Sequence, residues 1–376
     1  MKSLIELAQP EVRFLKPCIH GGEVWEVVKE DFNRFKILDF SANVNPLGPS
    51  PLALNAIKEN LWRIPYYPDL NATQLKLAIS NYIGNIEPEN IILGNGSTEL
   101  IYLFTDVFLK RGNEVLIPQP TFSEYERASL KSGGRVKFIK TNNDFTIDIN
   151  KILSEINSKT KIIFLCNPNN PTGKILSKKE MEKIVNEAYD KNVLVFIDED
   201  FIEFIPNCES YTLIKMVNQF SNLFIIRSFT KIFALTGLRI GYGIACKEMI
   251  KLISNFKIPW NINILAEVAA LATISDNQYL KKTYEIMKSE KPYLYKGLKR
   301  IHGLKPYPTY ANFILIDIRE AELTGSELKK RLLNYNILIR DCKSFKGLDE
   351  YYIRVSIRTR DENKFLLESL RKCLYE

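Results

Sequence analysis

The chain has 376 residues, of which 45% are hydrophobic, and this is enough to bury large cores and to form two domains. Its formal net charge of +8 is modest, and the basic residues are spread along the chain without a nucleic-acid recognition motif. We therefore expect small phosphorylated anions, and not nucleic acids, as its partners.

The cysteine and histidine content and the N-terminal residues predict the cellular compartment of the protein and whether it binds a metal. The six cysteines form no CxxC pair and no metal-ligand spacing, and two histidines cannot build a multi-histidine metal centre. Free thiols in a reducing cytoplasm and no metal site are expected. No apolar run approaches the ~18 residues of a spanning helix, and no signal peptide is recognisable, so no membrane association is expected.

From about residue 90, short runs rich in β-branched residues alternate with amphipathic stretches. The expected strands are residues 90–93, 114–117, 135–140, 161–166, 193–198, 223–227 and 239–245. The expected helices between them are residues 97–109, 122–132, 177–191 and 211–219. This alternation predicts an α/β fold with a mostly parallel seven-stranded sheet covered by helices on both faces. Such sheets bind ligands at the carboxyl ends of their strands.

The remainder of the chain predicts a second unit. The pattern becomes helical after Trp260 and then mixes strands (312–318 and 351–357) with helices (325–333 and 362–373). We expect a large domain over residues 40–275 and a smaller α+β domain over residues 276–376. Residues 1–39 are expected to form an N-terminal arm that contributes to the smaller domain.

The glycine-rich segment GNGSTE at 94–99 follows an expected strand and opens an expected helix. A helix N-terminus exposes backbone N–H groups, and small residues such as Gly96, Ser97 and Thr98 let an anion approach them, so this segment is a candidate phosphate seat. It is not a complete dinucleotide fingerprint, because Glu99 stands in place of the third glycine. The alternative is an ordinary turn capped by Ser97.

Three further residues could hold a planar ring. Asn170 lies in NPNNPTG at 167–173, after the strand 161–166, where its amide can donate to a phenolate oxygen. Asp198 ends the next strand, and a carboxylate there is costly unless it is paired, for example with a protonated pyridine nitrogen. Phe122 offers an aromatic face for stacking. The alternatives are a helix N-cap for Asp198 and plain core packing for Phe122.

The segment SFTKIFALTGLR at 228–239 carries Lys231 among apolar residues. A lysine amine can form a Schiff base with an aldehyde. The hydroxyls of Ser228 and Thr230 and the guanidinium of Arg239 can hold a phosphate dianion. The segment therefore suits an aldehyde cofactor that carries a phosphate, whereas a lysine taken alone is more often a surface side chain.

Two arginines and a histidine extend the set toward a substrate. Arg340 and Arg354 stand in runs of apolar and aromatic residues, where a guanidinium must find an anion, so they suggest a substrate with two anionic groups. His20 precedes two glycines, which allow a phosphate to approach closely. Taken alone, His20 fits an exposed loop better than a phosphate contact.

In this order the motifs resemble the fold-type I pyridoxal phosphate (PLP) enzymes of the aminotransferase class I and II superfamily. The resemblance implies that PLP is the cofactor, Lys231 its Schiff-base lysine, Asp198 the partner of its ring nitrogen and Asn170 that of its ring oxygen. The residues implied for its phosphate are Gly96, Ser97, Ser228, Thr230 and Arg239. A homodimer is implied as well, because a tyrosine of the neighbouring subunit often completes the phosphate site, and Tyr67 matches it.

Two families of this superfamily come close. The histidinol-phosphate aminotransferases share the Tyr-Pro-Asp, NPNNPTG and Gly-Leu-Arg elements. The L-threonine-O-3-phosphate decarboxylases of cobalamin biosynthesis look closer, through HGG at 20–22, LDFSANVNPLGP at 38–49, IRDC at 339–342 and Phe201. The substrate contacts that this resemblance implies are His20, Gly21, Asn43, Asn170, Arg340 and Arg354. Two residues depart from its pattern, Glu23 and Asp200, the latter standing where a small residue is usual.

The resemblance implies decarboxylation of L-threonine O-3-phosphate and leaves serine phosphate open as a second substrate. The runner-up, a histidinol-phosphate aminotransferase, requires an aromatic pocket for imidazole that the sequence does not locate. A regulatory protein that binds PLP without catalysis is the third alternative. Lys231, Asp198, Asn170 and Arg239 are all present, which disfavours that last alternative.

Overall fold

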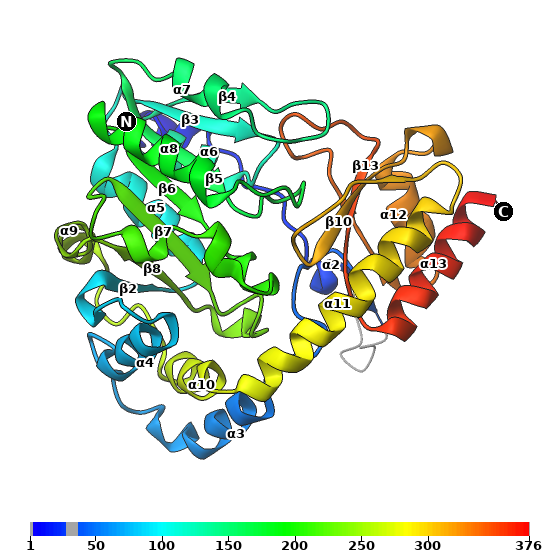
Figure 1. Ribbon diagram of the computed structural model, residues 1–376, viewed down its shortest axis with the longest axis horizontal. Helices are drawn as coiled ribbons and strands as arrows, with labels where there is room; N and C mark the ends of the chain where they lie inside the picture. Colours follow the sequence, from blue (N-terminus) through cyan, green and yellow to red (C-terminus); the bar gives the residue numbers. More distant parts are fainter. Residues whose placement is uncertain (1–2, 28–36, 376) are drawn as a thin grey trace.

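The computed structural model describes residues 3–27 and 37–375. A seven-stranded sheet forms the centre of its larger part (Figure 1). The strands are, in spatial order, β2 (Ile91–Gly94), β8 (Gly241–Ala245), β7 (Leu223–Ser228), β6 (Leu194–Asp198), β5 (Thr160–Cys166), β3 (Glu114–Gln119) and β4 (Arg135–Lys140). Neighbouring strands run parallel except β8, which is antiparallel to both β2 and β7. The predicted fold class is confirmed, and all seven expected strands take part.

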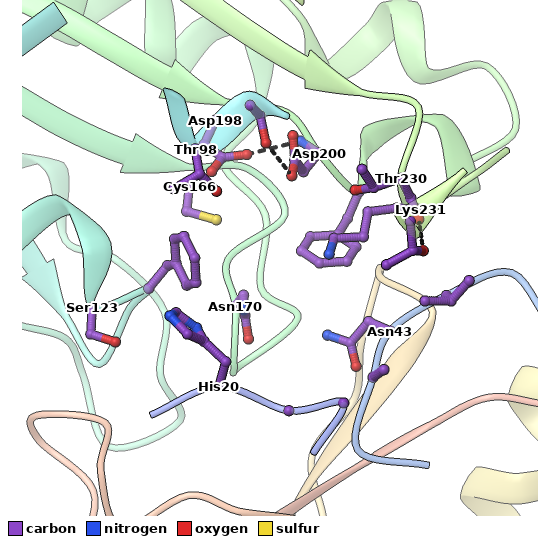
Figure 2. Close-up of a pocket in the computed structure, with 18 of the residues that line it drawn as sticks. His20, Asn43, Thr98, Ser123, Cys166, Asn170, Asp198, Asp200, Thr230 and Lys231 are labelled. Carbon is purple, nitrogen blue, oxygen red and sulfur yellow. Dashed lines mark hydrogen bonds between the residues drawn. The ribbon is translucent and has the colours of Figure 1, made fainter. Parts of the chain in front are cut away.

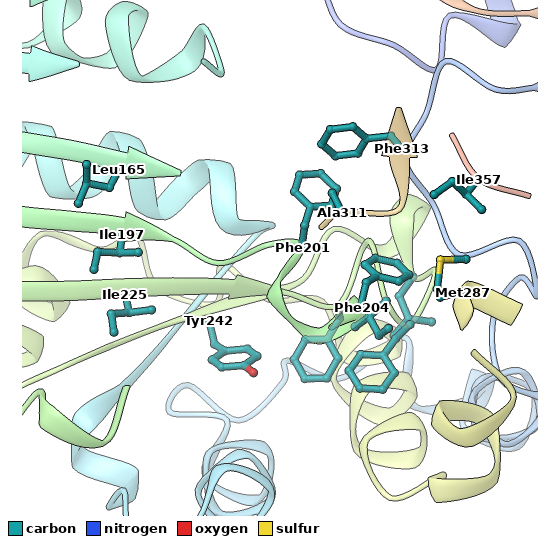
Figure 3. Close-up of a cluster of buried hydrophobic side chains, with 14 of the residues drawn as sticks. Leu165, Ile197, Phe201, Phe204, Ile225, Tyr242, Met287, Ala311, Phe313 and Ile357 are labelled. Carbon is teal, nitrogen blue, oxygen red and sulfur yellow. The ribbon is translucent and has the colours of Figure 1, made fainter. Parts of the chain in front are cut away.

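Both faces of this sheet are covered, which explains why its strands read as continuous apolar runs. In β5, Ile162 and Phe164 join one buried cluster, whereas Ile163 and Leu165 join another. The helices of the first cluster are α5 (Ser97–Phe108), α6 (Glu124–Lys131) and α9 (Lys247–Phe256). Those of the second include α4 (Thr73–Ile83) and α8 (Lys178–Asp190). In the second cluster Leu165, Ile197 and Ile225 lie side by side on neighbouring strands (Figure 3).

A four-stranded antiparallel sheet forms the smaller part. Its strands are, in spatial order, β12 (Arg340–Asp341), β13 (Tyr352–Ser356), β10 (Phe313–Asp317) and β9 (Lys305–Pro306). The helices α12 (Gly325–Leu333) and α13 (Arg360–Tyr375) pack beside it. The long helix α11 (Asn277–Lys299) runs from α10 (Ile264–Ile274) to this smaller part (Figure 1).

The segment before the larger part is divided between the two parts. The N-terminal segment lies beside the larger sheet (Figure 1), where Arg111 Nε lies 3.7 Å from Glu11 Oε1, whereas residues 38–39 join the smaller part. The short strand β1 (Leu38–Asp39) pairs in parallel with β11 (Ile337–Leu338). The boundaries at residues 39 and 275 stay a prediction. No helix within residues 3–27 and 37–375 is long and apolar enough to cross a membrane.

The expected helix at residues 211–219 is wrong. The chain forms two short 3-10 turns there, η5 (Cys208–Tyr211) and η6 (Ile214–Met216). The hydroxyl of Thr212 donates to Glu199 Oε1 at 2.6 Å and accepts from the N–H of Ile214 at 3.1 Å. Such a local side-chain bond competes with the helical backbone pattern.

Candidate active site

A cavity of about 690 Å³ lies where the carboxyl ends of β5 and β6 face the smaller sheet (Figure 2). The structure brings most of the predicted site residues to its wall. These are His20, Gly21, Asn43, Ser97, Thr98, Phe122, Asn170, Asp198, Thr230, Lys231, Arg239, Arg340 and Arg354. Residues from segments spread between His20 and Arg354 therefore meet at one site.

Lys231 follows β7 and points into this cavity beside the ring of Phe201 (Figure 2), whose centroid lies 5.9 Å from Nζ. Burial lowers the pKa of the Lys231 amine, the charge of Asp200 opposes this, and Arg239 and Arg354 add to the lowering. A lowered pKa increases the neutral fraction of the amine, which is the form that attacks an aldehyde. This placement and the lowered pKa would suit the Lys231 amine to act as a nucleophile.

The start of α5 forms a seat for an anion. Gly96 precedes the helix with φ +78°, and a Cβ there would lie 2.5 Å from Arg239 Nη2, so only glycine leaves room for the guanidinium. Beside it, the hydroxyls of Ser228 and Thr230 lie 2.7 Å apart. Gly96 and Ser228 do not reach the cavity wall themselves but support Arg239 and Thr230, which do. Helix N–H groups, hydroxyls and a guanidinium thus converge at one end of the cavity.

Ser97 is the first residue of α5 and not its cap, because Gly96 takes the cap position. Its hydroxyl donates to Asp200 Oδ2 at 2.8 Å. A serine has one hydroxyl hydrogen, so this bond leaves the backbone N–H of Ser97 as its donor toward a bound anion.

Asp198 lies at the end of β6 and its two oxygens have separate partners. Oδ2 accepts from the hydroxyl of Tyr125 at 2.5 Å, and Oδ1 accepts from the N–H of Asp200 at 2.9 Å. Burial and the charge of Asp200 raise the pKa of Asp198 to about 8. The N-cap alternative is wrong, since no α-helix begins here. A buried carboxyl with a raised pKa suits a cationic ligand atom that would stabilise its charged form.

Asn170 and Phe122 face the cavity as well. Asn170 Oδ1 accepts a hydrogen bond from Arg354 Nη1, which leaves the amide N–H groups of Asn170 for a ligand. The ring of Phe122 packs edge-on against Tyr125, with centroids 5.6 Å apart, and lies partly exposed on the cavity wall. Plain core packing therefore does not describe Phe122.

Arg340 and Arg354 are each only 4% exposed, and neither forms an ion pair with a carboxylate among residues 3–27 and 37–375. Arg340 donates to the carbonyls of Ile19 and His20 at 2.6 and 3.0 Å, and Arg354 donates to the carbonyl of Ser41 at 2.7 Å. Burial lowers the pKa of Arg354 to about 10. Neutral partners leave both positive charges uncompensated, which is costly until an anion binds.

Residues 19–22, here called the N-terminal strap, close one side of the cavity. Gly21 lies so near the chain at Ser41 that a Cβ would fall 2.2 Å from the carbonyl oxygen of Ser41. The N–H of Gly22 donates to Ser41 Oγ at 2.8 Å. The ring of His20 lies 5.7 Å from that of Phe122. The strap thus presents His20 to the site, while the side chain of His20 stays 47% exposed, as the exposed-loop alternative predicts.

A buried acid that the sequence did not single out holds this histidine. Glu124 Oε1 lies 2.8 Å from His20 Nε2, and the hydroxyl of Tyr102 donates to Oε2 at 2.5 Å. Burial alone would raise the pKa of Glu124, but hydrogen bonds from His20, Tyr102 and Cys18 lower it to about 2. Glu124 is therefore ionised and accepts a hydrogen from the imidazole.

Tyr67, unlike Gly96 and Ser228, neither lines the cavity of its own chain nor supports a residue that does. Its side chain is 80% exposed and packs on Trp260, with ring centroids 4.7 Å apart. Asn43, by contrast, is buried at the wall, and its Oδ1 has no hydrogen-bond partner within the described part of the chain.

Comparisons with known proteins agree on the superfamily. The family described as aminotransferase class I and II matches residues 36–370. A Caldanaerobacter subterraneus protein with the provisional name threonine-phosphate decarboxylase is 38% identical over 96% of this chain and 95% of its own length. The histidinol-phosphate aminotransferase of Methanothermobacter thermautotrophicus is 35% identical over 96% and 95%.

Among solved structures, L-threonine-O-3-phosphate decarboxylase from Porphyromonas gingivalis is similar, with a TM-score of 0.80 and 28% identity over 90% of this chain and 99% of that one. Most of the other similar relatives, 32% to 36% identical, carry the name histidinol-phosphate aminotransferase. The names alone therefore do not decide between the two reactions.

Proposed function

The chain belongs to the aminotransferase class I and II family of PLP-dependent enzymes, and within it we propose that it decarboxylates L-threonine O-3-phosphate. The observation that carries the proposal is the pair of buried arginines without carboxylate partners, Arg340 and Arg354, at one cavity wall. A substrate with both a carboxylate and a phosphate would supply the two missing anions.

The cavity residues fit PLP. Gly96 leaves the space that a Cβ would fill under Arg239, at the N-terminus of α5, where the phosphate would lie. The buried carboxyl of Asp198 lacks a cation and would face the ring nitrogen. Lys231 would bind the aldehyde carbon, and Asn170 would donate to the ring oxygen. PLP supplies an electron sink for the negative charge that develops at the substrate Cα.

The residues of the cavity would determine which bond breaks at the Cα atom of the substrate. The same catalytic groups serve decarboxylation and transamination, so the orientation of the substrate separates the two reactions. Arg340 and Arg354 would bind the two anionic groups, and His20 would contact the substrate from the strap. Arg340, Arg354 and His20 would favour loss of CO2 if they orient the substrate so that the bond from Cα to the carboxylate can give its electrons to the electron sink that PLP would supply.

Lys231 would also move the proton that completes the reaction. When CO2 leaves, the electron pair of its bond stays with the substrate and a proton must be added at Cα. The amine of Lys231, which lines the cavity beside Phe201, would serve as the general acid. The product would be (R)-1-aminopropan-2-ol O-phosphate, the aminopropanol unit of the cobalamin side chain.

Two further observations support the decarboxylase. The strap brings His20 and Gly21 to the cavity wall, which agrees with the substrate contacts implied by the HGG motif. The side chain beside Lys231 is Phe201, where the aminotransferases usually have a tyrosine that bonds the ring oxygen. Threonine-phosphate decarboxylase is the name of two similar proteins.

Histidinol-phosphate aminotransferase is the second candidate, and one observation favours it. Four aromatic side chains line the cavity, which provides the pocket for imidazole that the sequence alone did not locate. They are Tyr102, Phe122, Phe201 and Phe345. This candidate also has the greater number of named relatives.

Mass spectrometry of the product separates the two candidates. Purified protein loaded with PLP is incubated with O-phospho-L-threonine and no 2-oxo acid, and the Lys231→Ala variant serves as the inactive control. A catalytic product that is lighter by CO2 and keeps its amine supports the decarboxylase. Unreacted substrate, together with glutamate formed from 2-oxoglutarate and histidinol phosphate, overturns the proposal in favour of the aminotransferase.

We also propose a homodimer in which the partner subunit's Tyr67 completes the phosphate site. Large exposed apolar side chains gather around Tyr67 in the sequence, which suits a covered face. They are Leu52, Leu54, Leu61, Trp62, Ile64, Tyr66 and Leu70. Mixing Tyr67→Ala with Lys231→Ala protein would rebuild one intact site per mixed dimer and regain activity. No regained activity, or a monomer in analytical ultracentrifugation, would overturn the shared site.

A further inference from the structure

Asp200 is a second buried acid of the cofactor cavity, two residues beyond Asp198. It is 9% exposed and lines the cavity wall (Figure 2). Its N–H donates to Asp198 Oδ1 at 2.9 Å, and its Oδ2 accepts from Ser97 Oγ at 2.8 Å. Its other oxygen, Oδ1, has no hydrogen-bond partner within residues 3–27 and 37–375. One carboxylate oxygen is thus fixed by Ser97 while the other is buried and unpaired, which is costly unless a cation or donor compensates it.

The groups that face Asp200 come from several elements. Asp198 on β6 is the nearest acid, and Tyr125 on α6 and Cys166 on β5 stand behind it. Burial raises the pKa of Asp200, whereas the charge of Lys231, the bond from Ser97 and the charge of Arg239 lower it. Conversely, the charge of Asp200 is the largest effect that raises the pKa of Lys231 against its burial. Among the acids of the cavity, Asp200 therefore acts on Lys231 more strongly than Asp198 does.

We propose that Asp200 is a positioning residue that holds positive charge on the nitrogen of Lys231, while Asp198 serves the ring nitrogen of the cofactor. The two acids thereby have separate roles. Ser97 fixes one oxygen of Asp200, and the unpaired oxygen is left to compensate positive charge in the cavity that Lys231 also lines. A positive charge on this nitrogen activates the carbon bonded to it toward attack by a substrate amine. The inference uses the PLP-binding part of the proposed function and is independent of which bond breaks at Cα.

The test is a pH titration of the visible absorbance of PLP-loaded protein without any substrate. In Asp200→Asn the charge is removed and the bond to Ser97 can remain, so the absorbance should titrate about one pH unit or more lower than in the wild type. Asp200→Ala should shift it in the same direction, because both variants lose the charge. Asp200→Glu, which restores a carboxylate, should move it back toward the wild-type value.

Glu203 provides a matched control on the same loop. It is 2% exposed, accepts one hydroxyl bond from Tyr82 at 2.8 Å and does not line the cavity. Glu203→Gln should leave the titration unchanged. An unchanged titration in both Asp200→Asn and Asp200→Ala overturns the inference, and so does an equal shift in Glu203→Gln, which would indicate a general effect of buried charge.

Equilibrium dialysis of PLP against the same variants shows whether they still fold and bind PLP. A shifted titration can then be assigned to the lost effect of Asp200 on the lysine nitrogen. We expect both Asp200 variants to retain PLP, because the resemblance places a small neutral residue at this position in related enzymes. Retained PLP with a shifted titration supports the inference, and retained PLP with an unshifted titration overturns it. Since no substrate is present, the result does not depend on whether the decarboxylation proposal succeeds.

Discussion

The carboxylate of Glu124 lies 2.8 Å from Nε2 of His20, although the two residues are 104 positions apart in the chain. The bond ties the strap to α6 beside the larger sheet, while Arg340 of the smaller sheet holds the carbonyl of the same histidine at 3.0 Å. His20 is therefore fixed from both sides of the cavity. This dual attachment orients the imidazole toward the site.

Glu124→Gln should weaken binding of the phosphorylated substrate. The variant replaces a charge-assisted bond with a neutral one at a part-exposed histidine, which costs about 1–2 kcal/mol, or roughly 5- to 30-fold in KM. The turnover number kcat should change less, because Glu124 does not contact Lys231. Steady-state kinetics with O-phospho-L-threonine measures both constants.

Glu126→Gln is the control for that variant. Glu126 stands on the same helix and pairs with Lys346 at 3.1 Å, outside the cavity. It should leave KM within twofold of the wild type. Equal KM values for the Glu124→Gln variant and the wild type would show that the bond between Glu124 and His20 has no role in substrate binding.

Lys231→Ala should abolish the visible absorbance of the lysine-bound cofactor. Lys291 offers a demanding control, because burial lowers the pKa of its amine to about 8 although it lies outside the cavity. Its Nζ donates to the carbonyl of Tyr310 at 2.8 Å. Lys291→Ala should keep the full absorbance after loading with PLP. Retained absorbance in Lys231→Ala would contradict the assignment of the cofactor lysine.

Arg354→Ala should lower kcat/KM sharply. Removing a buried guanidinium that binds a substrate anion costs about 2–5 kcal/mol, which corresponds to roughly 30-fold to several thousand-fold. Arg354→Lys keeps a charge but loses the forked geometry, so we expect an intermediate value. Arg319→Ala removes an arginine that pairs with Asp317 outside the cavity and should have no such effect. Similar kcat/KM values in all three variants would contradict anion binding by Arg354.

Asp198→Asn should make the PLP-free protein more stable than the wild type, and this difference in stability should grow as the pH rises. Burial and Asp200 raise the pKa of Asp198 from 3.8 to about 8, so the folded wild type holds a proton that the unfolded chain has already lost. Stability from this group is complete below about pH 4 and falls as the pH rises to about 8. The difference in melting temperature between variant and wild type should grow across that window and stay constant above it. A difference independent of pH would contradict the raised pKa.

Much of the fold could be predicted because its signals are local. Six strands of the large sheet are mostly buried apolar runs, the edge strand β4 is partly exposed, and each of the seven predicted runs forms a strand. The prediction of a helix over residues 211–219 failed because the hydroxyl of Thr212 forms hydrogen bonds with Glu199 and Ile214. The bond to Glu199 depends on a tertiary neighbour, which the local sequence does not indicate. The helices α3 (Pro51–Glu59), α4 and α9 were not expected, although Ser50 and Pro51 form a recognisable start for α3.

The sequence predicted those residues of the candidate site that belong to recognisable motifs. It missed Glu124 and Tyr125, whose partners His20 and Asp198 are distant in sequence. Neither has a spacing that indicates its partner, because the contacts of α6 with His20 and Asp198 are set by the tertiary fold and not by local sequence. The one available signal is Glu124 itself, an acid in the first turn of a helix that also carries buried residues.

The strap contributes no strand to the seven-stranded sheet, yet it brings His20 and Gly21 to the cavity wall. Lys231, Asp198 and the phosphate seat all lie on the sheet or directly after its strands. Changes in the length or composition of the strap can therefore alter which anion is accepted without disturbing the lysine and its acids. In this architecture part of the proposed substrate contact lies on a peripheral segment, while the proposed reacting groups lie on the sheet scaffold.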